Sequence, residues 1–307
     1  MIIKIKTGDP EQDFYFAKTL NNLSKKHSYV SAGECELTLG HDDSTLIGSN
    51  NISFFFEPYQ VRQDTWNDAE KFRNNRLTFC WNKIFCEKYG FEYLPHQWWF
   101  ITWMRDLYDE NYELQFAERI EKKYLSCMIL SNKNFGPQDE YNLYLKRHEI
   151  AKFFDSKKFR FSKSKELKND FHLYGDWNEY KNVCLGDRKP GYISDTLKDY
   201  KFCFCPDSTN RPLYSNGWVT ERVFNAFRCM TIPIYLGAEN VEEIIPLSCF
   251  IHMKYFKNIQ EIYKYIKNMS DAEYSSYMTN IHNFYTSKDC KLLVHPQTLA
   301  DKLDRLL

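Results

Sequence analysis

The chain has 307 residues, which is enough for two domains of ordinary size. Hydrophobic residues make up 43% of it and charged residues 27%, a balance typical of globular proteins and unlike that of disordered ones. The 41 basic and 41 acidic residues cancel, which argues against nucleic acid as the main partner, because nucleic-acid-binding proteins usually carry a basic excess.

The first half alternates short apolar runs with amphipathic stretches, as α/β proteins do. Asn51–Phe56 is the clearest strand, and it should end before Pro58, which cannot donate to a strand ladder. Further strands are expected at Ile2–Ile5 and Arg76–Cys80, helices at 82–89 and 104–122, and a Trp-rich core stretch at Gln97–Trp103.

A second round of the same pattern begins at Lys123. We therefore predict a boundary near residues 120–123, between domains of residues 1–121 and 122–307, with the last helix a candidate to pack back on the first domain. Strands are expected at Tyr124–Leu130, Phe171–Tyr174, Tyr200–Cys205 and Thr231–Leu236, and helices at Tyr141–Phe154, Ile193–Asp199, from about Thr220, and at 259–268, 271–284 and 297–306. Lys157–Lys168 is interpreted as a solvated basic face.

Ten cysteines occur without a Cys-x-x-Cys pair or a zinc-like Cys/His block, so free thiols and a reducing, cytoplasmic location are expected. The first residues lack a signal-peptide core, and no segment reaches the roughly 18 apolar residues that span a bilayer. The chain as given is expected to be soluble, either cytoplasmic or a trimmed soluble piece. Its oligomeric state is open.

The segment Tyr200–Gly237 combines a strand, a polar loop, a helix start and another strand. Thr220 can cap the helix through its hydroxyl, which leaves first-turn N–H groups and the positive helix end to face an anion. Arg222 opposes the helix dipole, which makes sense if a diphosphate lies in front of it, whereas Glu221 favours the dipole. An ordinary capped surface helix is the competing interpretation.

Two further residues are candidates for the same crevice. Arg147 follows a strand and a loop, and arginine binds phosphate with two parallel hydrogen bonds. Glu57 ends an apolar strand, where partial desolvation would raise its pKa and suit it to accept a proton. A surface arginine and a solvent-facing glutamate are the alternatives. The chain has no Asp-x-Asp, so arginine and the helix end, rather than a metal, would carry the charge of a diphosphate.

The segment Tyr200–Gly237, which contains KFCFCPDST and NGWVTERVFNAFRCMTIPIYLG, resembles the donor-binding motif of the α1,3-fucosyltransferases. The family pattern runs Tyr-Lys-Phe-x-apolar-x-Phe-Glu-Asn-Ser, then Gly-Tyr-Val-Thr-Glu-Lys, an apolar helix, and (Val/Ile)-Pro-(Val/Ile)-Tyr-x-Gly. Weaker likeness extends over most of residues 50–255, including NISFFFEP and YLSCMILSNKN.

The resemblance implies an α/β fold of two facing Rossmann-like domains (GT-B type) with a cleft between them. The first would bind a glycan acceptor and the second a guanosine diphosphate (GDP) sugar, with inversion at the anomeric carbon and no obligatory metal, Mn²⁺ or Mg²⁺ being at most stimulatory. By motif position, Glu57 would be the general base and Glu221 would stabilise positive charge near the anomeric carbon. The implied donor-binding residues are Arg147, Asp207, Ser208, Trp218, Thr220 and Arg222.

The predicted function is therefore transfer of L-fucose from GDP-fucose to a glycan hydroxyl. Ser208 stands where the family has asparagine and Trp218 where it has tyrosine. The serine removes a two-headed hydrogen-bonding group, which leaves another nucleotide sugar as an alternative donor. A non-catalytic carbohydrate-binding protein is the alternative of another class, and the presence of Glu57, Glu221 and Arg222 argues against it.

Overall fold

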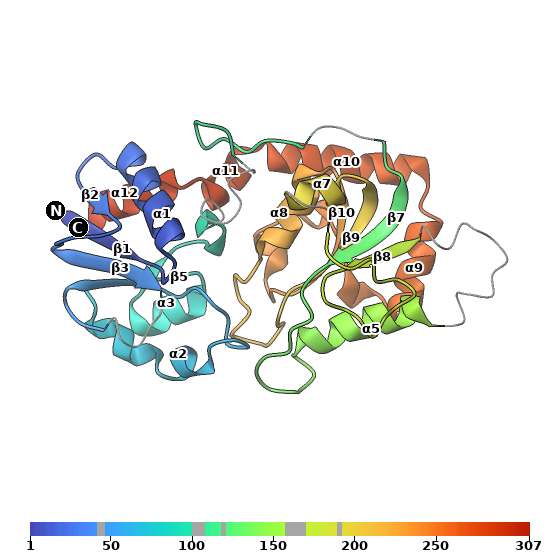
Figure 1. The fold of residues 1–307 in the computed structure, drawn as a ribbon, viewed down its shortest axis with the longest axis horizontal. Helices are drawn as coiled ribbons and strands as arrows, with labels where there is room; N and C mark the ends of the chain where they lie inside the picture. Colours follow the sequence, from blue (N-terminus) through green and yellow to red (C-terminus); the bar gives the residue numbers. More distant parts are fainter. Residues whose placement is uncertain (42–46, 100–107, 118–120, 157–169, 189–191) are drawn as a thin grey trace.

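The computed structural model describes the chain apart from residues 42–46, 100–107, 118–120, 157–169 and 189–191. Its described residues form two α/β domains, each built on a fully parallel sheet (Figure 1). The first sheet has six strands in the order β2-β1-β3-β4-β5-β6, and the second has five in the order β11-β10-β9-β7-β8. These are two Rossmann-like domains, as the sequence predicts.

The first sheet and its helices come from the N-terminal part of the chain. Its elements are β1 Ile2–Lys6, α1 Pro10–Leu23, β2 Ser28–Val30, β3 Leu37–His41, β4 Asn51–Phe54, α2 Gln63–Asn67, the 3₁₀ helix η1 Ala69–Asn74, β5 Leu77–Cys80, α3 Lys83–Tyr89, β6 Glu92–Tyr93 and the 3₁₀ helix η2 His96–Trp99.

The alternation of side chains along β4 explains how helices cover both faces of this sheet. Phe54 stacks on Phe79 and belongs to the core under α1, whereas the next residue, Phe55, packs against Trp66 and Phe72 on the side of α2 and η1. Successive residues of a strand point to opposite faces, so an unbroken phenylalanine run is buried on both. The chain then leaves the strand toward Glu57.

The second domain repeats this design. Its elements are β7 Tyr124–Ile129, α5 Leu143–Asp155, β8 Phe171–Tyr174, α7 Ile193–Leu197, β9 Tyr200–Pro206, α8 Glu221–Arg228, β10 Ile232–Leu236, η5 Val241–Glu243, η6 Leu247–Cys249, β11 Ile251–His252, η7 Met253–Tyr255, α9 Ile259–Lys267, α10 Asp271–Tyr285, α11 Lys288–Val294 and α12 Gln297–Leu306. The strand order reverses between β7 and β9, which is where such sheets bind ligands, beyond the carboxyl ends of the strands.

The last helix lies on the first domain. In α12, Leu299, Ala300 and Leu303 join the core that contains Ile3 and Phe16, and the two chain ends lie close together (Figure 1). The exact boundary between residues 121 and 122 stays a prediction, because residues 118–120 lie outside the described residues.

Most predicted elements are present, but the expected helix at 104–122 is wrong for residues 108–117. Asp109 Oδ1 accepts hydrogen bonds from the backbone N–H groups of Asn111 (2.8 Å) and Glu113 (3.0 Å), and Tyr108 pairs antiparallel with Leu114. A side-chain-bonded turn thus replaces the helix. The described residues do not include 104–107 and 118–120 of that expected helix. They also leave out 100–103 of the Trp-rich stretch and the basic segment Lys157–Lys168. Gln97, Trp98 and Trp99 are buried, as predicted.

All ten cysteines are free. None of the helices in the described part of the chain combines the length and apolar character needed to cross a bilayer. The cytoplasmic location stays a prediction.

Amide side chains of the first domain hold loops of the second. Gln97 Nε2 donates to the carbonyl of Val219 (2.8 Å), Asn82 Nδ2 to that of Leu213 (2.5 Å) and Gln60 Nε2 to that of Phe135 (2.6 Å). These bonds join the loops that follow β4, β5 and β6 to the loops that follow β7 and β9. They set the distance between the two sheet edges that carry the site.

Candidate active site

A cavity of about 220 Å³ lies between the two domains, lined by residues that follow the strands of both sheets. The first domain contributes Phe56, Glu57, Val61 and His96, and the second Ser131, Lys133, Phe135, Tyr144, Arg147, Ser208, Trp218, Thr220, Glu221 and Arg222. Of the eight residues that the sequence singles out, seven line this cavity, and Asp207 lies behind it.

Glu57 reaches the cavity from the first domain, three residues after the end of β4. Its pKa is raised, mainly by burial and next by the carboxylate of Glu221, while Arg222 and Lys133 act in the opposite direction. Its backbone carbonyl accepts the indole N–H of Trp66 (2.9 Å), which fixes the turn. Glu57 is therefore a partly buried carboxyl group facing charged groups of the other domain, not a solvent-facing strand end.

Thr220 lies at the start of α8, but its hydroxyl does not cap the helix as expected. It donates to Oδ1 of Asp207 instead, at 2.5 Å. Since the cap supplies no side-chain acceptor, the first N–H groups of α8 receive no bond from it. Thr220, Glu221 and Arg222 line the cavity, so the start of α8 lies beside it. Binding of an anion by the N–H groups of this helix end stays a prediction.

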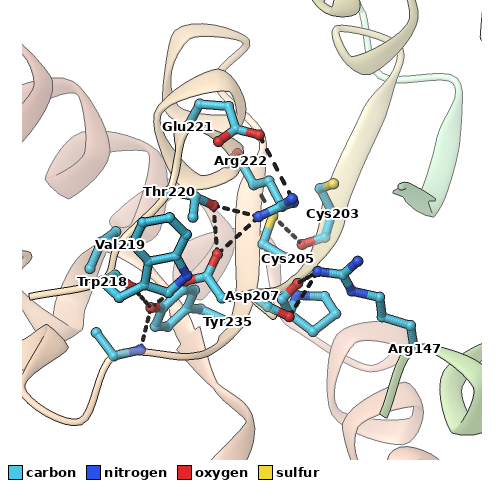
Figure 2. Close-up of polar contacts among 12 residues, drawn as sticks. Arg147, Cys203, Cys205, Asp207, Trp218, Val219, Thr220, Glu221, Arg222 and Tyr235 are labelled. Atoms are coloured by element: carbon cyan, nitrogen blue, oxygen red, sulfur yellow. Dashed lines mark hydrogen bonds and ion pairs between the residues drawn. The ribbon is translucent and has the colours of Figure 1, made fainter. Parts of the chain in front are cut away.

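Arg222, in the first turn of α8, is held from behind by acidic and hydroxyl groups. Its Nη1 donates to Asp207 Oδ1 (3.1 Å) and to Thr220 Oγ1 (2.7 Å), and its Nη2 lies 3.9 Å from Glu221 Oε1 (Figure 2). Burial would lower the pKa of Arg222, but the carboxylates of Glu221 and Asp207 outweigh it and raise that pKa. The guanidinium is a permanent, oriented cation.

Arg147 is buried, with 2% of its surface exposed, so the alternative of a surface arginine is wrong. Its guanidinium lies over the ring of Tyr144 (4.4 Å to the centroid), and Nη2 donates to the carbonyls of Asp207 (2.9 Å) and Pro206 (3.3 Å). Burial and the nearby charge of Arg222 lower its pKa to about 9, so it remains protonated at neutral pH. A second buried cation therefore stands beside Arg222.

Four side-chain donors around the cavity are buried and have no hydrogen-bond partner within the described part of the chain. They are Nε of Arg147, Nε of Arg222, Oγ of Ser208 and Nε1 of Trp218. Buried polar groups are nearly always paired in native proteins, so a cluster of unpaired donors calls for an acceptor from outside the chain. An anion with several oxygen atoms supplies such acceptors.

Sequence reasoning missed His96 and Tyr144. His96 packs its ring against Trp218 (4.4 Å between centroids), and burial lowers its pKa to about 3, so it is neutral. It follows β6 at the same sheet edge as Glu57, but the sequence predicts no strand at 92–93, so only the structure shows this position. Tyr144 adjoins the helix start after β7, and only the tertiary fold places it under Arg147.

The residues that the structure describes contain no group of three or more His, Cys, Asp or Glu side chains arranged to hold a metal ion.

Two facing Rossmann-like domains with a cationic cavity between them define the GT-B class of fold, which many glycosyltransferases share. Solved structures with this architecture include an α1,3-fucosyltransferase with GDP (TM-score 0.59, 15% identity, 91% of this chain and 81% of that one) and WaaG, a glycosyltransferase involved in lipopolysaccharide biosynthesis (TM-score 0.55, 9% identity, 98% and 99%). At these identities the likeness establishes the fold.

Residues 146–297 match the family described as glycosyltransferase family 10 (fucosyltransferase), C-terminal part. The chain is also 28% identical over 186 residues to mouse (Mus musculus) 4-galactosyl-N-acetylglucosaminide 3-alpha-L-fucosyltransferase 9, a match covering 57% of this chain and 44% of that protein. An Arabidopsis thaliana alpha-(1,4)-fucosyltransferase is 34% identical over 88 residues, 28% of this chain and 21% of its own. Residues 146–297 therefore carry the C-terminal fucosyltransferase part of glycosyltransferase family 10, in a divergent form.

The matched part of the mouse relative is less than half its length, so its activity does not transfer automatically to this chain. The family match contains Arg147, Asp207, Ser208, Trp218, Thr220, Glu221 and Arg222 but begins after Glu57.

Proposed function

We propose that this chain is an inverting glycosyltransferase that transfers L-fucose from GDP-fucose to a hydroxyl group of a glycan, without an obligatory metal ion. The observation that carries the proposal is one cavity with the carboxyl group of Glu57 on one side and Arg147, Glu221 and Arg222 on the other. The match of residues 146–297 to family 10 supports the choice of fucose.

The donor side of the cavity suits a leaving diphosphate. As the bond between the anomeric carbon and the diphosphate breaks, negative charge gathers on the phosphate oxygens. Arg147, Arg222 and the N-terminal end of α8 are fixed before the reaction starts, so they stabilise this charge without reorganising. Arginine and a helix end thus do what a metal ion does in other enzymes.

The acceptor side suits proton removal. The acceptor hydroxyl attacks the anomeric carbon from the face opposite the diphosphate, its proton passes to the Glu57 carboxylate, and GDP leaves with the bonding electrons. Burial raises the pKa of Glu57, which makes it a stronger base than an exposed glutamate. Glu221, beside Arg222, is assigned to stabilise the positive charge that develops near the anomeric carbon.

A donor other than GDP-fucose is the second candidate, because Ser208 and Trp218 occupy the positions of the asparagine and tyrosine of the family pattern. Each side chain lines the cavity and has a buried donor without a partner among the described residues, which supports a role for both in selecting the ligand. The acceptor remains open, since the family match lies outside the first domain.

Thermal melting with a panel of nucleotides tests the donor. A ligand at 100 times its Kd stabilises a protein by about 2.7 kcal/mol, which moves the melting temperature measurably. Stabilisation by GDP and GDP-fucose but not by uridine nucleotides supports the proposal, and the reverse order contradicts it. Mass spectrometry of glycan acceptors incubated with GDP-fucose then shows whether a deoxyhexose is added.

A further inference from the structure

Asp207, which the sequence suggests as a donor-binding residue, has no exposed surface and does not line the cavity. Its carboxylate accepts three hydrogen bonds. Oδ1 accepts from Thr220 Oγ1 (2.5 Å) and Arg222 Nη1 (3.1 Å), and Oδ2 accepts from the hydroxyl of Tyr235 (2.7 Å), as Figure 2 shows. A carboxylate used in this way has little left to offer a ligand.

The backbone of the same residue holds the other arginine. The carbonyl oxygen of Asp207 accepts from Nη2 of Arg147 (2.9 Å), and its N–H donates to the carbonyl of Leu236 (2.8 Å) in β10. Asp207 therefore touches both guanidinium groups, one through its side chain and one through its main chain. Each arginine is left with a buried Nε that has no partner among the described residues.

Tight packing fixes this arrangement. A Cβ atom added at Gly237 would lie 2.4 Å from Asp207 Oδ2 and 2.3 Å from the hydroxyl oxygen of Tyr235, which is closer than a Cβ atom approaches other heavy atoms in real proteins. That hydroxyl also accepts the N–H of Ala238 (2.6 Å), so its proton is directed toward Asp207. The carboxylate is enclosed on the side away from the cavity.

Two adjacent cations repel each other, and each lowers the tendency of the other to stay charged. The charge of Arg222 lowers the pKa of Arg147, and the charge of Asp207 raises it. We propose that Asp207 is a positioning residue that holds Arg147 and Arg222 as a preformed pair of cations for the donor diphosphate, and that it does not itself contact the donor. This inference rests on the proposed function.

The pair of cations formed by Arg147 and Arg222 should bind the donor less tightly in acid. Burial raises the pKa of Asp207 to about 6, against the effects of Arg222, Thr220 and Tyr235. Protonation below that pH removes the charge that anchors Arg222, so donor affinity should fall as the pH is lowered through about 6. The charged or titratable groups that face Asp207 are Glu221 and Arg222 from α8, Tyr144 and Arg147 from α5, Tyr235 from β10 and Cys205 from β9.

Asp207→Asn tests the positioning role because it removes the charge of the side chain but keeps its size. The amide oxygen can still accept from Thr220, and the Tyr235 hydroxyl can turn toward the carbonyl of Trp218, 3.3 Å away. Because burial raises the pKa of Asp207 from 3.8 to about 6, its ionisation opposes folding above about pH 3.8 and most strongly above about pH 6. The neutral amide avoids that cost, so Asp207→Asn should fold. Thermal melting and circular dichroism check this.

The matched control is Asp170→Asn. Asp170 is also a buried carboxylate of the second domain, accepting from the hydroxyl of Tyr263 (2.7 Å) and from Lys267 Nζ (2.8 Å), but it does not line the cavity. The probe is GDP-fucose, measured by isothermal titration calorimetry without acceptor. Its diphosphate is esterified at both ends, whereas the terminal phosphate of GDP would itself titrate near pH 6.

At pH 7.5, Asp207→Asn should weaken GDP-fucose binding by about ten- to a hundredfold, the range for a lost charge-assisted bond, while Asp170→Asn binds as the wild type does. The wild-type affinity should fall between pH 7 and pH 5, and that of Asp207→Asn should not. In Tyr235→Phe the pH at which affinity falls should move upward, because the Tyr235 bond lowers the pKa of Asp207.

If Asp207→Asn and Tyr235→Phe keep the wild-type affinity and pH dependence while Arg147→Ala and Arg222→Ala lose binding, the positioning role is wrong and the proposed function stands. If the wild-type protein does not bind GDP-fucose at all, the proposed donor is wrong and the positioning role falls with it.

Discussion

Replacing Glu57 by glutamine separates catalysis from donor binding. The change keeps the size of the side chain and its place beside Val61 and Phe56, but it removes the group that accepts the proton. A positioned general base contributes roughly 10²–10⁴-fold to the rate, which corresponds to about 2.7–5.4 kcal/mol of transition-state stabilisation. The kcat of Glu57→Gln should therefore fall by ~10²–10⁴-fold.

Donor affinity should be unchanged or slightly tighter in this variant, because the substitution removes a negative charge that faces the same cavity as the diphosphate site. Glu70→Gln is the matched control, since Glu70 is an exposed glutamate of the first domain paired only loosely with Arg73 (3.8 Å), and its rate should equal that of the wild type. The assay is fucosyl transfer from GDP-fucose to saturating acceptor, with calorimetry for GDP-fucose binding.

The pH profile adds a second readout. Burial and Glu221 raise the pKa of Glu57, and a general base must be ionised, so wild-type kcat at saturating GDP-fucose should fall as the pH is lowered through that raised pKa, above the ordinary value of 4.5. The residual rate of Glu57→Gln should not show this fall at low pH. A variant that keeps more than about a tenth of the wild-type kcat would refute the assignment of Glu57 as general base.

Three further outcomes are expected. Arg147→Ala should weaken GDP-fucose binding by about ten- to a hundredfold in calorimetry, and binding within twofold of wild type would show that this arginine does not meet the diphosphate. Gly237→Ala should lower stability by about 1–3 kcal/mol, seen as a fall in melting temperature, because its methyl group would overlap Asp207 and Tyr235; an unchanged melting temperature contradicts the tight packing. Chelation by EDTA should leave the transfer rate unchanged, and loss of activity restored by Mn²⁺ would overturn the metal-independent proposal.

The sequence predicts the second domain better than the first. Strands such as Phe171–Tyr174 and Tyr200–Cys205 are apolar runs with clear ends, and the structure has them within a residue. Helix α1 was missed, although Asp9 caps it through its side chain and Pro10 occupies its first position, both recognisable start signals.

Arg147 shows that burial can be predicted where a charged residue interrupts an apolar stripe. The buried face of α5 includes Leu143, Arg147, Ile150 and Phe154, spaced by four, three and four residues, so Arg147 occupies a position of the stripe. An arginine on the apolar face of a helix must have a buried partner or ligand. This signal was available from the sequence alone.

Asp207 illustrates what could not be predicted. Its partners Thr220, Arg222 and Tyr235 are 13, 15 and 28 residues away in the chain, and only the neighbouring strands β9 and β10 and the start of α8 bring them together. The sequence motif identified the residue but not the direction of its side chain. Local patterns find the elements, and long-range packing decides which side chains face the cavity and which stand behind it.

A crystal structure of the protein with GDP-fucose tests the central claim most directly. We expect the diphosphate within hydrogen-bond distance of Arg147 and Arg222, the anomeric carbon turned toward Glu57, and Asp207 without a contact to the donor. A diphosphate bound away from both arginines, or Glu57 on the side of the sugar that carries the diphosphate, would contradict the account.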